Sequence, residues 1–380
     1  MQVSWTKPVK YANGYEPSII CLSDKFVLEV HQTNDNYNSE LTYSKGMLNP
    51  STNIITWVKG LKYGIGQNPS LVYLGKNDFI ELHQQLNKKN DKIPDLYYNY
   101  GSFNPSTKVI TWEESKQYGT GTQPVATYIG KNKILELHSD QTDYAALGIL
   151  SNNFRYRIGT IEEKKRIKWS GLNLYGNGYN PTIAYLDDNI LLGVNAIGND
   201  QQFFQTGIFN SDGDTITFVN SGNLNTGSSI FSPYDGGSSL IYLGNNSILV
   251  VCSSDSYVEN IEGIDAGSPG NTSGNYGLYL LGTINRKNNK IEWSAPLYYN
   301  EGYSLSISSM NSDKIIEVHV DSNLEFSGLF YQIATINDSS NPKDNLPIQK
   351  PVKQHKLLTS EELIKKINKQ LGLINNKQDN

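Results

Sequence analysis

Tyr63–Leu71 reads Y-G-I-G-Q-N-P-S-L, and I-E-L-H at Ile80–His83, Y-N-Y-G at Tyr98–Gly101 and I-T-W at Ile110–Trp112 follow it. Each segment is short, rich in β-branched and aromatic residues, and bounded by Gly, Pro, Asn or Asp, which predicts a β-strand. The whole set returns along the chain at a period of about 50 residues, with four strands in each unit. Such a period predicts the blades of a β-propeller.

Every segment of this unit has relatives elsewhere in the chain. The Y-x-x-G turn and the strand after it begin at Tyr11, Tyr63, Tyr118, Tyr175 and, in a degenerate form, Tyr299. A strand with Glu two residues before His contains Glu29 and His31, Glu81 and His83, Glu136 and His138, and Glu317 and His319. The closing strand ends in Trp57, Trp112, Trp169, Phe218 and Trp293.

The register of the repeats predicts six blades. The third strand of each unit places a small residue three positions after an aromatic one, at Gly46, Gly101, Gly159, Gly207, Gly282 and Ala334. The longest step, from Gly207 to Gly282, is too short for an extra blade, so we expect long loops at 219–238 and 254–276. The last unit lacks a closing Trp strand, while Val3-Ser4-Trp5 precedes any unit. We therefore expect the N-terminal strand to complete the last blade and remove its open edge.

Composition excludes several classes of function. The net charge is −5 and no basic stripe occurs, which argues against a nucleic-acid partner. No apolar run is long enough to span a membrane as a helix. Cys21 and Cys252 are predicted to be buried thiols rather than a disulfide, and neither has a metal-ligand neighbour, so we expect neither metal nor cofactor.

The chain divides into a propeller, 1–337, a Pro-containing linker, 338–358, and a C-terminal helix and tail, 359–380. Thr359 and Glu362 form a capping box at the start of this amphipathic helix. The helix is expected either to dock on the propeller, to join copies of the chain, or to bind a partner protein. A strand begins almost at the first residue and leaves no room for a signal peptide, so either the protein is made without a leader or a leader has been removed from this sequence. The first alternative suggests a cytoplasmic protein or leaderless export, the latter consistent with an extracellular or cell-surface target.

The candidate site is the repeated Glu-x-His strand. Glu29 and His31 lie two residues apart and so point to the same side of their strand. Either these pairs make hydrogen bonds between blades that satisfy buried polar groups, or they line one ligand pocket in each of the four blades that contain them. The predicted ligand-binding residues are Glu29, His31, Gln32, Glu81, His83, Gln84, Glu136, His138, Glu317 and His319, with Tyr11, Tyr63, Tyr118 and Tyr175 of the turns. Trp5, Trp57, Trp112, Trp169 and Trp293 complete the set, because a Trp at the rim can pack between blades and also stack on a sugar.

The phrases P-S-I at Pro17–Ile19, L-E-V-H at Leu28–His31 and L-T-Y-S-K-G at Leu41–Gly46 resemble the PLL-type bacterial β-propeller lectins and related tectonin-like propellers. The resemblance extends over residues 3–337. It implies binding of fucose or of an O-methylated sugar in shallow pockets between blades. The chain departs from the family pattern by His after E-V and by six units in place of seven.

Two other classes remain open. A sialidase-like enzyme needs an arginine cluster, but the chain has four arginines and three of them, Arg155, Arg157 and Arg166, belong to one unit. Catalysis also needs one asymmetric group of residues, whereas these polar residues repeat. A protein-interaction scaffold or toxin-associated binding module would use the acidic segment 254–276 and the C-terminal helix. The sequence favours a multivalent, non-catalytic lectin that binds glycans through avidity.

Overall fold

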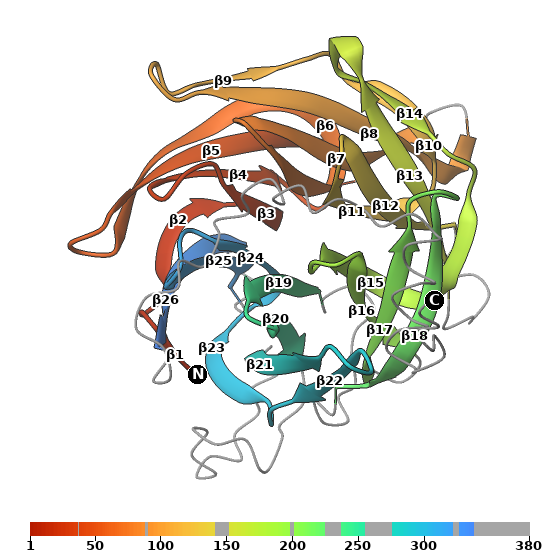
Figure 1. Ribbon diagram of the computed structural model, residues 1–380. Helices are drawn as coiled ribbons and strands as arrows, with labels where there is room; N and C mark the ends of the chain where they lie inside the picture. Colours follow the sequence, from red (N-terminus) through yellow and green to blue (C-terminus); the bar gives the residue numbers. More distant parts are fainter. Residues whose placement is uncertain are drawn as a thin grey trace, which may run out of the picture.

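The computed structural model describes residues 1–36, 38–87, 90–140, 152–197, 201–224, 237–254, 276–321 and 327–337. These residues form antiparallel sheets and one short 3₁₀ turn, Glu163–Lys165. The sheets stand around a common axis like the blades of a propeller, with the inner strands near the axis and the fourth strands at the periphery (Figure 1). The chain is an all-β propeller.

Four consecutive strands pair in each repeat. The first repeats contain β3 (Tyr15–Cys21), β4 (Phe26–Gln32), β5 (Ser39–Asn49) and β6 (Ile54–Gly75), then the end of β6 with β7 (Asp78–Asn87), β8 (Asn90–Asn104) and β9 (Val109–Trp112). The next contain β11 (Thr122–Gly130), β12 (Lys133–Ser139), β13 (Asn152–Glu162) and β14 (Arg166–Trp169), then β15 (Asn173–Tyr185), β16 (Ile190–Ile197), β17 (Gln201–Asn210) and β18 (Thr215–Asn223). The last contain β19 (Ser238–Gly244), β20 (Ser247–Ser254), β21 (Tyr276–Asn285) and β22 (Lys290–Trp293), then β24 (Tyr303–Ser309), β25 (Lys314–Val320), β26 (Gly328–Asn337) and β1 (Gln2–Trp5).

The Tyr-x-x-Gly segments lie in strands, which corrects the expectation that they form turns. After the closing Trp the chain breaks briefly and then pairs again with the same third strand. β2 (Val9–Asn13), β10 (Lys116–Thr120) and β23 (Leu297–Glu301) pair in this way with β26, β8 and β21, and the middle of β6 and the start of β15 do the same with β5 and β13. Each Tyr is therefore held by backbone hydrogen bonds at a fixed place beside its own repeat.

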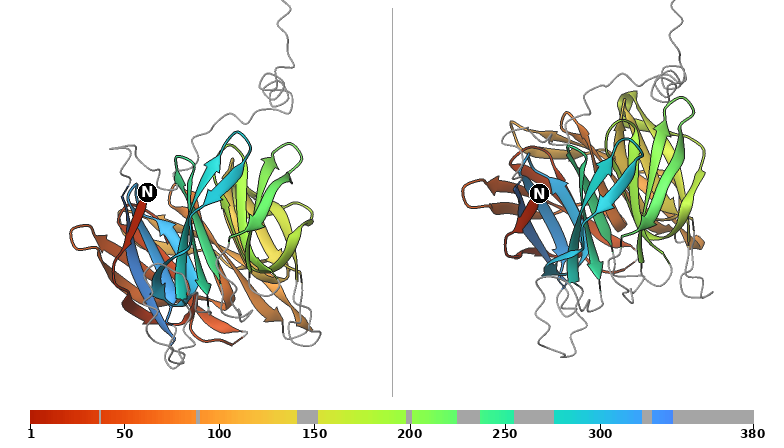
Figure 2. Two further views of the ribbon diagram at one scale, coloured as in Figure 1. Left: turned by 90° about the horizontal axis from the view of Figure 1, so that it is seen from below. Right: turned by 60° about the horizontal axis from the view of Figure 1, so that its bottom comes forward.

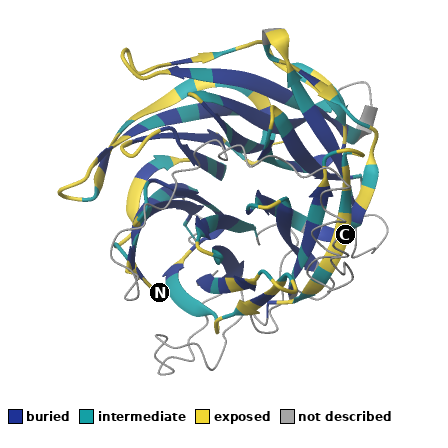
Figure 3. Ribbon diagram, in the orientation of Figure 1, coloured by how far each residue is buried: buried dark blue, intermediate teal, exposed yellow. Residues whose placement is uncertain are grey.

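The apolar core lies between neighbouring sheets rather than at one centre. Val27 of β4 packs with Val318 of the preceding sheet, whereas its neighbour Leu28 packs with Phe79 of the following sheet. Because side chains alternate along a strand, each sheet buries one row against each neighbour. The middles of the strands are accordingly buried, and exposed residues gather on the peripheral strands and hairpin tips (Figure 3). Polar residues on these strands must therefore find partners inside the protein.

The first strand of the chain pairs with the last. β1 runs antiparallel to β26, with Val3 opposite Ile336 and Trp5 opposite Ala334. Thr6 extends this contact, because its backbone N–H donates to the Ile333 carbonyl and its hydroxyl accepts from the Ile333 N–H. The inner strands also contact one another in a closed cycle, from β24 through β3, β6, β11, β15 and β19 back to β24. The side views show the sheets side by side around the axis (Figure 2).

The structure also tests the expectations for the two cysteines and for the long loops. Cys21 and Cys252 are free and buried, as predicted, and burial raises the pKa of each thiol to about 12. The loop expected at 219–238 is wrong at both ends, because β18 continues to Asn223 and β19 begins at Ser238. Most of the second expected loop, the linker 338–358 and the C-terminal helix lie outside the described residues.

We expect deletion of residues 1–6 to destabilise the whole propeller. The deletion exposes the edge of β26 and removes Val3 and Trp5 from an apolar cluster, a loss of about 3–5 kcal/mol. Denaturant unfolding of the deleted chain and of Gln2→Ala, an exposed control, measures the difference. Unfolding at the wild-type midpoint would contradict a role for β1 in closing the ring.

Candidate functional site

In each of the four repeats that have both the Glu and the His, these two side chains form one group with a Tyr and a Trp, whose rings stack. Trp57 lies parallel to Tyr11 with ring centres 4.6 Å apart, and the Tyr11 hydroxyl faces Glu29, which holds His31. The same stacking joins Trp112 to Tyr63 at 4.6 Å, Trp169 to Tyr118 at 4.7 Å, and Trp5 to Tyr299 at 4.3 Å. The N-terminal strand thus supplies the Trp that the last repeat lacks.

The histidine of each group is fixed by the carboxylate two residues before it. The Nδ1 atoms of His31, His83, His138 and His319 lie 2.9–3.0 Å from the nearest oxygen of their Glu partners. All four Glu side chains are fully buried, and the four His side chains are at most 3 % exposed. A buried carboxylate that loses its partner is strongly destabilising, so removing either member of a pair should destabilise the fold.

The tyrosine hydroxyls share these carboxylates. Tyr118 donates to Glu136 Oε1 at 3.1 Å, and Tyr299 donates to Glu317 Oε1 at 3.4 Å. Burial, together with the neighbouring Glu81 carboxylate, raises the pKa of Tyr63 well above its ordinary value, and the same two causes act on Tyr11 with Glu29. These tyrosines are consequently neutral donors across the physiological pH range.

A glycine lets the turn segment close over each histidine. Gly121 has a φ of +149°, and a Cβ there would collide with the His138 ring and lie 2.7 Å from the Ser139 carbonyl oxygen. Gly66 packs against His83 in the same manner. Close approach to the imidazole therefore requires glycine at both positions, and at Gly121 the backbone angle favours it as well.

The glutamines after the histidines join consecutive repeats. Gln32 Oε1 accepts from the backbone N–H of Asn68 at 3.0 Å, and Gln84 Oε1 accepts from that of Gln123 at 2.7 Å. Asn68 and Gln123 precede proline and have φ of 51° and 53°. A side-chain acceptor thus satisfies a backbone donor at a strained turn of the next repeat.

The repeats differ in what faces the carboxylate. In one of them, Arg157 donates to Glu136 Oε2 at 3.0 Å and to the Tyr118 carbonyl, and its guanidinium lies 4.8 Å from the Tyr118 ring centre. The next repeat has Gly193 in place of Glu, because a Cβ there would collide with the Tyr175 hydroxyl. Its Asn195, in place of His, donates to backbone carbonyls. The repeat of β20 has the fully buried Val250 and Cys252.

The predicted residues therefore come together, but not on an exposed rim. The continuing fourth strands cover the Glu, His and Gln side chains, and this burial corrects the expectation that they line open pockets. Tyr11, Tyr63 and Tyr118 lie within the groups, whereas Tyr175, whose repeat lacks the Glu and the His, packs edge-on against Phe218. Half-buried side chains with covered Nε1 atoms are those of Trp5, Trp57, Trp112, Trp169 and Trp293. Trp293 packs edge-on against Phe204 at 5.6 Å. Direct ligand contact by these side chains stays a prediction, and His319 is the one that reaches the pocket described next.

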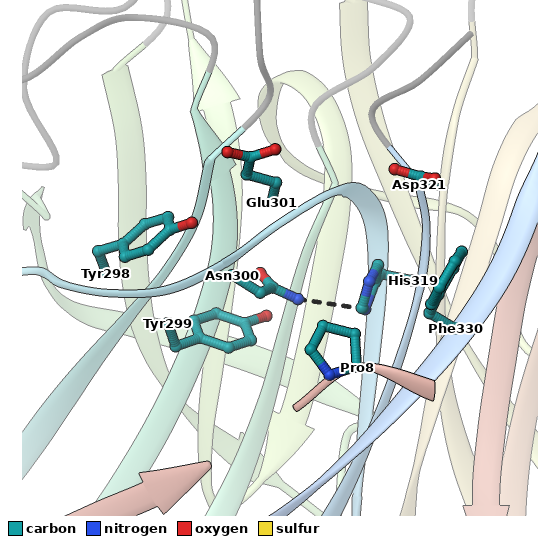
Figure 4. Close-up of a pocket in the computed structure, with 8 residues that line it drawn as sticks. All are labelled: Pro8, Tyr298, Tyr299, Asn300, Glu301, His319, Asp321 and Phe330. Atoms are coloured by element: carbon teal, nitrogen blue, oxygen red, sulfur yellow. Dashed lines mark hydrogen bonds between the residues drawn. The ribbon is translucent and has the colours of Figure 1, made fainter. Parts of the chain in front are cut away.

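A pocket of about 340 Å³ opens between β23 and the sheet of β25 and β26. Its walls come from Pro8, from Tyr298–Glu301 of β23, from His319 and Asp321 at the end of β25, and from Phe330 of β26. Phe330 stacks on the His319 ring with centres 5.8 Å apart. The carboxylates of Glu301 and Asp321 lie at the same end of the pocket on opposite sides, with Asn300 and His319 joined below them (Figure 4).

Sequence reasoning missed most of this pocket. Asn300, Glu301, Asp321 and Phe330 were not among the candidates, which were chosen because they repeat. The available signal was a departure from the repeat, because Asn300 follows its Tyr where the other turns have Ala12, Gly64, Gly119 and Gly176.

Comparisons with known proteins identify the fold alone. No family model matches the chain, and no curated protein matches its sequence. A Dyadobacter fermentans protein of unknown function has a TM-score of 0.56 at 12% identity, covering 88% of this chain and 99% of its own. The α-L-arabinofuranosidase Arb93a of Fusarium graminearum has a TM-score of 0.55 at 15% identity, covering 87% and 97%. The NanB sialidase of Streptococcus pneumoniae has a TM-score of 0.57 at 10% identity, covering 89% and 70%. The fold is thus a propeller like those of sialidases and arabinofuranosidases.

Within the described ranges, no group of three or more His, Cys, Asp or Glu side chains has a geometry that could hold a metal ion. Over the same ranges, no helix is long and apolar enough to cross a membrane.

We expect Gly121→Ala to lower the stability of the protein by about 1–3 kcal/mol, because the new methyl group must displace His138 or the backbone. Gly171→Ala is the matched control, since a Cβ at Gly171 meets no atom within 4 Å. Thermal and denaturant unfolding of both variants test the contact. Equal stabilities would show that the turn does not depend on its close approach to the imidazole.

We expect stability to fall as the pH rises above about 10, the ordinary pKa of tyrosine. The folded-state pKa of Tyr63 is raised, so the folded protein keeps a proton that the unfolded chain loses, and the stabilisation present below pH 10 is lost above it. Unfolding midpoints measured from neutral to alkaline pH should fall less steeply in Tyr63→Phe than in the wild type. Identical pH dependence would mean that Tyr63 ionises alike in both states.

Proposed function

We propose that this protein is a carbohydrate-binding protein that holds a sugar in the pocket between β23 and β25–β26. The observation that carries the proposal is the make-up of that pocket. Tyr298 and Phe330 offer ring faces, while Glu301, Asp321 and Asn300 supply polar atoms around one cavity. Apolar walls with a few convergent polar groups are typical of small-molecule sites. A sugar matches them with its C–H face and its ring of hydroxyls.

The structural neighbours support a sugar as the ligand class. One is an arabinofuranosidase whose structure has also been determined with arabinobiose, and others are sialidases. The likeness lies in the fold, so for this chain the ligand rests on the pocket. Fucose, a methylated sugar and arabinose are the first sugars to test.

We further infer a ring of six four-stranded blades closed by β1, because the paired sets and the cycle of inner strands account for every described sheet. A multivalent lectin needs related sites on other blades. His83 has the closest counterpart, with Tyr97 stacked on it at 5.6 Å as Phe330 is on His319. The proposal therefore includes a second, related site at Tyr97.

Glycoside hydrolysis is the second candidate, because Glu301 and Asp321 flank one pocket and paired carboxylates are the usual machinery of glycosidases. Incubation with p-nitrophenyl α-L-arabinofuranoside and α-L-fucoside distinguishes the two functions. Hydrolysis by the wild type that is lost in Glu301→Gln would replace the binding proposal with an enzyme.

We expect Phe330→Ala to weaken sugar binding by ~10-fold or more, because it removes an aromatic wall of the pocket. Titration calorimetry with methyl α-L-fucopyranoside, its O-methylated derivatives and arabinobiose measures affinity and stoichiometry. Val109→Ala is the control, since Val109 is exposed on β9 across the ring from the pocket (Figure 1). If the wild type binds none of these probes and no glycan of a broad array, the proposed function is wrong.

A further inference from the structure

The repeats follow a size rule at the position after the turn tyrosine. Small residues there pair across the strands with large buried ones, namely Ala12 with Leu329, Gly64 with Leu41, Gly119 with Leu96, and Gly176 with Phe154. The four large partners are fully buried. In each of these repeats an apolar side chain of the third strand therefore fills the space beside the turn.

The repeat that ends at β1 reverses this rule. Asn300 of β23 is the larger member and pairs with Gly277 of β21. The two changes compensate one another, because a Cβ at Gly277 would collide with Asn300 Oδ1. A carboxamide consequently occupies the place of an apolar side chain at this blade interface.

In this structure the Asn300 carboxamide is hydrogen-bonded through its nitrogen, and its oxygen, which faces Gly277, has no partner among the described residues. Its Nδ2 donates to Gln332 Oε1 at 3.2 Å and lies 3.2 Å from His319 Nδ1. The side chain is only 4% exposed, and Oδ1 has no hydrogen-bond partner among the described residues. A buried acceptor without a donor destabilises a protein, so a polar residue at this place needs a reason beyond packing.

The pocket provides that reason, because Asn300 forms part of its wall. Next to it, the carboxylates of Glu301 and Asp321 are acceptors as well. Two carboxylates and an amide oxygen call for a ligand that donates hydrogen bonds. Negative charge on that ligand would be repelled by the carboxylates. A neutral sugar meets both conditions.

We propose that Asn300 is the residue that determines which sugar this pocket accepts. Resting on the function proposed above, the inference adds that the carboxamide, after a rotation about its Cβ–Cγ bond, accepts a hydrogen bond from one sugar hydroxyl. A site built to bond a hydroxyl rejects analogues that lack it far more strongly than an apolar wall does. The site at β23 therefore differs in selectivity from a related site at Tyr97, whose turn has Gly64.

The test restores the size rule of the other repeats. The double variant Asn300→Gly/Gly277→Leu should fold, and its affinity at this site should fall by ~10-fold or more because the hydroxyl partner is gone. The matched control Gly176→Asn/Phe154→Gly makes the opposite exchange in a repeat that belongs to neither proposed site, and it should keep the wild-type affinity. Asn300→Ala alone, which brings no new bulk, serves if the double variant does not fold.

Titration calorimetry with methyl α-L-fucopyranoside, arabinobiose and monodeoxy derivatives of whichever binds gives affinity and selectivity for each variant. Selectivity between a sugar and one of its deoxy derivatives should be lost in the Asn300 variants and kept in the control. Wild-type affinity and selectivity in the folded double variant would overturn the inference while leaving sugar binding in place. Failure of the wild type to bind any probe would instead overturn the function on which it rests.

Discussion

The structure depends on the burial of both faces of every sheet between its neighbours. A sheet in this position has no solvent-exposed face on which polar side chains can be hydrated, so the charged residues of its second strand must be satisfied internally. The Glu-x-His pair meets this constraint with the smallest number of residues. The carboxylate accepts from the imidazole and the tyrosine, and the tryptophan covers the tyrosine ring. The turn glycine, the brief break after the Trp strand and the second pairing of the chain all serve to place that tyrosine.

The arrangement of Glu, His, Tyr and Trp tolerates substitutions, as the repeats that depart from it show. Where Gly193 replaces the carboxylate, the Tyr175 hydroxyl moves into the vacated volume, and where Val250 and Cys252 replace the pair, the strand becomes wholly apolar. Arg157 adds a guanidinium to the partners of the Glu136 carboxylate. The bonds between Glu, His and Tyr thus lie within one repeat and can change there, while the Gln32 and Gln84 side chains bond to the repeat that follows.

Function in such a ring is best sought where the repeat is broken without a structural reason. The Asn300 and Gly277 exchange conserves volume but leaves an amide oxygen without a partner beside a pocket. The likeness to sialidase and arabinofuranosidase propellers supports the fold but does not indicate which chemistry the protein performs, since the same architecture hosts many activities. The residues of this one pocket therefore carry the proposed function.

By itself, the sequence determined the strand pattern and the length of the repeat. It also predicted that the two cysteines are free and buried, and that Val3–Trp5 is similar to the closing strands. These follow from local periodicity and from short motifs that stand at equal intervals. It also identified the residues that gather in each repeat, because same-strand spacing places Glu and His on one face. It did not determine that they are buried, since that depends on where the chain pairs again after the Trp. Nor could it show the pocket, because cross-strand register brings Asn300 to Gly277 and Phe330 to His319. Register is decided by the packing of whole sheets, which only the tertiary structure contains.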